Sequence, residues 1–113
     1  MGYKEITGRM ISQIKKRAKV SSIKYSLTKE YLYKLFISQD KKCALSKMPI
    51  VLGVTKDDET TASLDRINSK LGYIEGNVQW LHKHINKMKL DHSQEYFITL
   101  CENVARSNYN SFK

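Results

Sequence analysis

The stretch TASLDRINSKLGYIEGNVQWLHKHINKMK, residues 61–89, decides the fold expected for this chain. Residues 61–67 are a plausible strand, although this segment carries two charged side chains. The loop that follows contains two glycines, which are typical of turns. Residues 77–80 alternate polar and apolar side chains, which is typical of a short strand. Residues 81–90 are expected to form a helix. The segment therefore predicts a strand, a loop, a second strand and a helix in direct succession.

Two helices are expected before this segment. Thr7 can cap a helix that runs to about Lys19, because apolar side chains recur there at helical spacing. Thr28 can cap a second helix that ends near Gln39. The residues between these two helices favour a connector rather than a long strand. Together they predict a basic helical arm of about 40 residues.

One helix is expected after the segment. Ser93 is its N-cap, and its apolar stripe consists of Tyr96, Phe97, Leu100, Cys101 and Val104. The 113 residues correspond to one α+β domain, with the basic arm in residues 1–42, the strand–loop–strand–helix core in residues 43–90, and the C-terminal helix and tail in residues 91–113.

The charge of the chain is positive and unevenly distributed. The net charge is +9, and residues 1–42 carry eleven Lys and Arg against three Asp and Glu, whereas the rest carries nine against eight. Such a concentration of positive charge favours binding to a polyanion, because each phosphate that the protein neutralises releases counterions. A merely solvated surface is the alternative for a run of charge alone. A membrane surface is disfavoured, since no apolar run approaches bilayer length and no aromatic-rich amphipathic face accompanies the basic one. The chain is expected to be intracellular.

The two cysteines do not predict a zinc site. Cys43 and Cys101 are 58 residues apart, and neither belongs to a Cys-x-x-Cys pair. Both are expected to be small buried apolar residues.

Three polar side chains stand out by their spacing. Asp65 lies near the end of the first strand, Asn77 opens the second strand, and Asn86 lies within the following helix. A carboxylate and an amide oxygen from different elements are hard ligands that suit Mg²⁺ or Mn²⁺. Each residue also has an ordinary interpretation: a salt bridge for Asp65, a turn for Asn77 and a solvated helix position for Asn86.

In order and spacing, the segments SLDRI (63–67), GY (72–73), GNVQW (76–80) and INKMK (85–89) together resemble the HNH endonucleases of the ββα-metal, or His-Me finger, superfamily. CALS (43–46) and the helix that begins after Thr28 resemble the lead-in of small HNH proteins that are common in phage genomes. The resemblance implies a ββα-metal core in residues 43–90, DNA cleavage with Mg²⁺ or Mn²⁺, and a phage origin. It places Asp65 and Asn86 at the metal-ligand positions. Asn77 then orients the base or braces the loop.

One position departs from the family pattern. Arg66 stands where the family has the histidine that activates water, and arginine holds its proton above pH 12. Arg66 can instead contact a phosphate. His82, four residues before Asn86, would share its face on a helix and is the expected substitute base, whereas His84 points away. Alternatively, metal and hydroxide suffice, or the scaffold binds DNA without cutting it.

The expected partner is DNA, held mainly through its phosphate backbone by a monomer or a homodimer. An RNA-binding or ribosome-associated protein is a more distant alternative that charge alone favours. The residues expected to contact DNA are Arg9, Lys15, Lys16, Lys19, Lys83 and Lys87.

Overall fold

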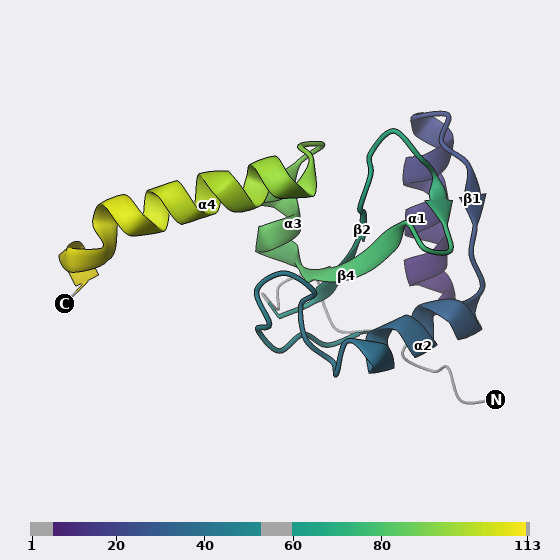
Figure 1. The fold of residues 1–113 in the computed structure, drawn as a ribbon. Coiled ribbons are helices and arrows are strands. Elements are labelled where there is room, and N and C mark those ends of the chain that lie inside the picture. The colour runs from purple at the N-terminus through teal and green to yellow at the C-terminus, as the bar shows by residue number, and fades with distance from the viewer. Residues whose placement is uncertain (1–5, 53–59, 113) are drawn as a thin grey trace.

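A computed structural model describes residues 6–52 and 60–112, which form an α+β fold (Figure 1). The described elements are, in order, α1 (Gly8–Val20), β1 (Tyr25–Ser26), α2 (Lys29–Ser38), β2 (Ala62–Arg66), β3 (Tyr73–Ile74), β4 (Val78–His82), α3 (Lys83–Lys89), α4 (Gln94–Asn108) and the 3-10 helix η1 (Tyr109–Phe112). The molecule is elongated, with extents of 48 × 28 × 24 Å, because α4 extends away from the body (Figure 1).

The three predicted N-caps are confirmed. The side chains of Thr7, Thr28 and Ser93 each accept a hydrogen bond from the backbone N–H three residues later, at the starts of α1, α2 and α4. Each hydroxyl satisfies one of the N–H groups that the first turn of a helix leaves without a partner.

The centre of the fold is an antiparallel hairpin of β2 and β4. Asp65 lies opposite Gln79, and Leu64 lies opposite Trp80. Because successive side chains of a strand point to opposite faces, Leu64 and Trp80 face the helices α1 and α2, whereas Asp65 faces α3. Trp80 is 1% exposed, and its Nε1 donates to the Leu32 carbonyl at 2.9 Å.

The loop between β2 and β4 contains a strand that the sequence did not predict. Tyr73 and Ile74 of β3 pair in parallel with Tyr25 and Ser26 of β1. Gly72 permits this pairing, because a Cβ there would lie only 2.6 Å from the Lys24 carbonyl oxygen.

Helices α1 and α2 are not a separate arm. Ile14 of α1 and Phe36 of α2 are buried in one apolar cluster with Leu64 and Trp80 of the hairpin. The basic N-terminal segment is therefore one wall of the body.

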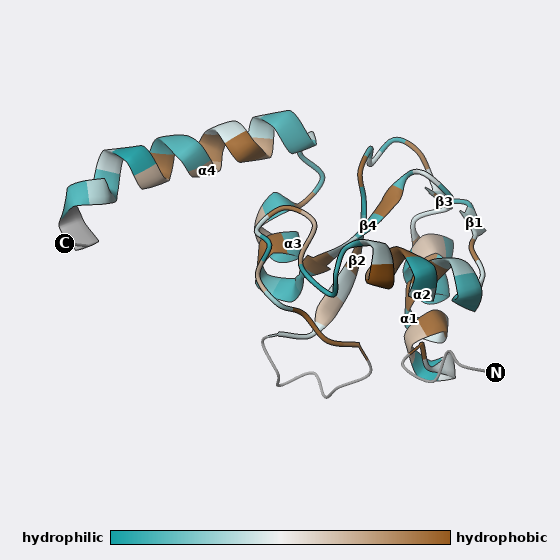
Figure 2. Ribbon diagram, turned by 60° about the horizontal axis from the view of Figure 1, so that its bottom comes forward, coloured by the Kyte–Doolittle hydropathy of each residue, from teal (hydrophilic) through white to brown (hydrophobic). Residues whose placement is uncertain are grey.

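The C-terminal helix α4 extends outward from the body, so most of its predicted apolar stripe does not pack against the core (Figure 1). Phe97 is the buried residue of its stripe, whereas Leu100 and Val104 are exposed, Val104 by 65%. Apolar and polar residues alternate along this extended helix (Figure 2). No helix in residues 6–52 and 60–112 has the length and apolar character that crossing a membrane requires.

Candidate functional site

Helix α3 packs along β2 on the hairpin face opposite α1. Asn86 Nδ2 donates to Ser63 Oγ at 2.6 Å, and one turn later Lys89 Nζ lies 3.1 Å from Asp65 Oδ2. Two side chains that lie two positions apart on β2 thus contact two side chains that lie three positions apart on α3. The structure places Asp65 and Asn86, the predicted metal ligands, on the same side of the hairpin.

Asp65 forms a salt bridge, the ordinary interpretation that its sequence position left open, and its partner is Lys89. Lys89 is 0% exposed and Asp65 is 6% exposed, and Lys89 Nζ also approaches Asp65 Oδ1 at 3.3 Å and the Arg66 carbonyl at 3.2 Å. Gln79 Nε2 donates to Asp65 Oδ2 at 3.0 Å and contacts Gln94 Oε1 at 2.7 Å. The carboxylate is therefore neutralised and hydrogen-bonded, as a buried charge must be.

The donor set at this position suits Mg²⁺ or Mn²⁺ in kind. Asp65 offers a carboxylate. The amide nitrogen of Asn86 donates a hydrogen bond to Ser63, so the amide oxygen of Asn86 points away from Ser63. Among the described residues no three His, Cys, Asp or Glu side chains gather in a metal-binding group. Magnesium sites commonly use one or two carboxylates and retain several waters. The two side chains therefore offer oxygens of the kind that a hard cation binds, and the ammonium group of Lys89 holds the Asp65 carboxylate in this structure.

Asn77 braces the loop between β2 and β4. Its Oδ1 accepts from the Asn68 N–H at 2.9 Å, and its Nδ2 donates to the carbonyls of Asn68 and Gly72 at 3.1 and 2.8 Å. Asn77 is buried, and one amide side chain satisfies three backbone groups of the loop. Asn77 therefore holds together the two ends of the loop segment from Asn68 to Gly72.

Asn77→Ala should lower the free energy of unfolding by about 1–3 kcal/mol, because it leaves buried backbone groups without partners. Urea denaturation measures the change. Asn68→Ala is the matched control, since its side chain is exposed and accepts from the nearby Lys70 N–H, and its cost should be within about 0.5 kcal/mol. Equal costs for the two variants would contradict the bracing role.

Arg66 does not share a site with Asp65. The two residues are adjacent on β2 and point to opposite faces, and the Arg66 guanidinium donates to the carbonyls of Ser69 and Leu71. It also lies 5.5 Å from the centre of the Tyr73 ring. Arg66 thus holds the loop, and the expected clamp on a phosphate at Asp65 does not follow from its position.

His82 does not occupy the helix position from which it was expected to act as the base. The helix begins at Lys83, so His82 is the last residue of β4 and the N-cap of α3, where it does not share a helix face with Asn86. Its Nδ1 accepts from the His84 N–H at 3.2 Å. A neutral imidazole has only one accepting nitrogen, and here the cap uses it. His84 itself is exposed.

His82→Ala should therefore act on stability rather than on proton transfer. Loss of the cap should lower the free energy of unfolding by about 1 kcal/mol. The pH dependence of any cleavage should keep its shape near neutrality. Loss of the rising limb of the pH–rate profile in this variant would restore His82 as the base.

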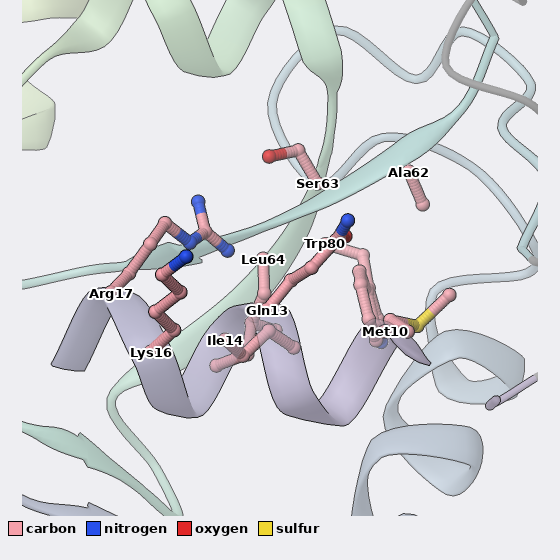
Figure 3. Close-up of a pocket in the computed structure, with 9 residues that line it drawn as sticks. All are labelled: Met10, Gln13, Ile14, Lys16, Arg17, Ala62, Ser63, Leu64 and Trp80. Carbon is pink, nitrogen blue, oxygen red and sulfur yellow. The ribbon is translucent and has the colours of Figure 1, made fainter. Parts of the chain in front are cut away.

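The basic residues of α1 fall on two flanks of the helix. Lys16 and Arg17 line a groove of about 400 Å³ between α1 and the hairpin, and both project on the same side (Figure 3). Ser63 lies at its edge with its hydroxyl directed away from α1, whereas Leu64 points toward α1 (Figure 3). Lys15 lies on the other flank, with Nζ 5.7 Å from the centre of the Tyr25 ring.

The other four residues that were predicted to contact DNA lie at the two ends of α1 and on α3. Arg9 is exposed in the first turn of α1, and Lys19 is exposed in its last turn. Lys83 and Lys87 are four residues apart and project from one side of α3. None of these four lines the groove beside the hairpin.

The cysteines differ in burial. Cys43 is fully buried as expected, whereas Cys101 is only half-buried on the extended helix. Burial raises the pKa of the Cys43 thiol, but hydrogen bonds from Ser46 and the His82 and Leu45 backbone outweigh it, so the pKa is lower than usual. The two cysteines are free.

Comparison with known proteins finds no matching family model, no matching curated protein and no matching solved structure.

Proposed function

We propose that this chain is an HNH-type endonuclease that cuts or nicks DNA. The observation that carries the proposal is the hairpin of β2 and β4 followed directly by α3, with Asp65 on the hairpin face that α3 covers and Asn86 on α3, in contact with Ser63. Their order and spacing are those of the family that the sequence resembles. The loop brace of Asn77 supports the same assignment.

In the proposed mechanism, Asp65 and Asn86 would hold Mg²⁺ or Mn²⁺ through their side-chain oxygens. When bound, the ion would stabilise negative charge on the scissile phosphate and the leaving oxygen. Asn77 fixes the loop, and Gln79 keeps its hydrogen bond to the Asp65 carboxylate. The basic flank of α1 positions the DNA backbone without reading its sequence.

A DNA-binding module without catalysis is the second candidate. It is favoured because Asp65, Arg66 and His82 all have structural partners in this arrangement. In this alternative the ion pair of Asp65 with Lys89 is permanent, and the hairpin only presents the basic surface.

Incubation of supercoiled plasmid with Mg²⁺, Mn²⁺ or EDTA separates the two candidates. The endonuclease produces nicked or linear DNA with either ion and none with EDTA. A folded protein that retards DNA on a gel but cuts none under any metal is the binding module.

The groove position of Lys16 and Arg17 leads to a prediction about DNA affinity. Replacing both with alanine should flatten the salt dependence of binding by roughly 0.9 per lost phosphate contact. The matched variant Lys15→Ala/Lys19→Ala removes the same charge from the opposite flank and should have a smaller effect. Fluorescence anisotropy with a labelled duplex at several salt concentrations measures the slopes. Equal slopes for the two variants would mean that the groove flank is not the contact surface.

A further inference from the structure

The buried side chain of Lys89 has no role in the mechanism above. Its Nζ contacts both oxygens of Asp65, at 3.1 and 3.3 Å, and the Arg66 carbonyl at 3.2 Å. An ammonium can donate three hydrogen bonds, and three oxygens surround this one. Lys89 thus occupies the position at the carboxylate that a bound cation requires.

We propose that Lys89 is the resident cation of the Asp65 site and that a divalent ion binds there only by displacing its ammonium group. This inference rests on the proposed function, since it takes Asp65 to be a metal ligand. Two cations cannot both sit against one carboxylate without mutual repulsion in a buried setting. The apparent metal affinity is therefore lowered by the fraction of molecules in which the ion pair is closed.

The end of α3 lets Lys89 leave without unfolding the hairpin. Lys89 is the last residue of the helix, and Leu90 follows with φ 53° and ψ −133°, a conformation that non-glycine residues seldom adopt. Leu90 is exposed, and the turn is closed by a hydrogen bond from the His92 N–H to the Lys89 carbonyl. Lys89 is thus held beside a strained turn at the surface. Gln79 also donates to the Asp65 carboxylate, and because Gln79 lies on β4 its contact does not depend on the position of the end of α3.

Metal binding to the full chain tests the proposal without any measurement of cleavage. Mn²⁺ binding is titrated by electron paramagnetic resonance of the free ion, and melting temperatures are recorded with Mn²⁺ and with EDTA. Lys89→Met and Lys89→Gln should each bind Mn²⁺ about tenfold or more tightly than the wild type. Their melting temperatures should rise more with Mn²⁺ than that of the wild type. Lys89→Gln can still donate a hydrogen bond to Asp65, so it provides a folded protein if the methionine variant is unstable.

The double variant Asp65→Asn/Lys89→Met is the matched control, because it removes both charges of the ion pair together. It should lose the tight Mn²⁺ binding and the metal-dependent rise in melting temperature. Affinities within about twofold of the wild type for both single variants would overturn the proposal, as would tight binding that persists in the double variant. If the single variants bind Mn²⁺ more tightly and the double variant does not, but plasmid stays uncut, the endonuclease assignment is wrong. The competition between Lys89 and the metal ion is then still supported. If plasmid is cut while Lys89 variants bind Mn²⁺ as the wild type does, the competition falls and the endonuclease assignment stands.

Discussion

Asp65→Ala should abolish plasmid cleavage and also lower the free energy of unfolding by about 3–5 kcal/mol. Cleavage is lost because the carboxylate ligand is removed. Stability is lost because the ammonium group of Lys89, which is 0% exposed, loses its carboxylate partner. Asp65→Asn separates the two effects, because its amide oxygen can still accept from Lys89 while the charge that binds the metal is gone.

Urea denaturation and plasmid nicking measure these two losses. Glu102→Ala is the control, since Glu102 and Arg106 form an ion pair whose side chains are 62% and 70% exposed. Exposed pairs of this kind contribute about 1 kcal/mol or less. Undiminished nicking by a folded Asp65→Asn protein would remove Asp65 from the metal site.

Trp80→Ala should lower the free energy of unfolding by about 3–5 kcal/mol. The indole fills the space between the hairpin and helices α1 and α2, and its Nε1 donates to the Leu32 carbonyl. Trp80 is the only tryptophan, so its replacement removes the tryptophan fluorescence of the protein. Unfolding should therefore be followed by circular dichroism.

Two further variants calibrate the Trp80 measurement. Trp80→Phe keeps most of the apolar surface but leaves the Leu32 carbonyl without its donor, so it should lose less than Trp80→Ala. Val104→Ala, on the extended helix, should change stability by about 0.5 kcal/mol or less. A loss at Trp80 no greater than that at Val104 would contradict the position of the core.

Local signals in the sequence predicted most of the elements. The caps at Thr7, Thr28 and Ser93 were identified because each hydroxyl precedes a run with helical spacing. The parallel pairing of β1 with β3 was missed, because two-residue strands leave no periodicity and their partners are far apart in sequence. The stripe on α4 indicated an apolar face, but a pattern on one helix cannot specify what packs against it.

The sequence analysis named Asp65, Asn77 and Asn86 as candidate site residues, but it did not name the side chains that contact Asp65. A shift of two residues in the start of α3 moved His82 from a helix face to the end of a strand, which removed the reason for choosing it. Lys89 and Gln79 were missed, although both could have been found. Lys89 lies three residues after Asn86 and so shares its face, and Gln79 lies on the strand expected to pair with Asp65. Charge balance was the signal that could have identified Lys89 as the partner in the salt bridge considered for Asp65, because a buried carboxylate requires a cation nearby.

Diffraction from crystals soaked in Mn²⁺ tests the central claim most directly, because the anomalous signal of the ion locates it without reference to activity. The account predicts Mn²⁺ bound to the Asp65 carboxylate, with Asn86 beside it and the Lys89 ammonium withdrawn from its ion pair. An intact pair of Asp65 with Lys89, with Mn²⁺ bound elsewhere or not at all, would contradict it.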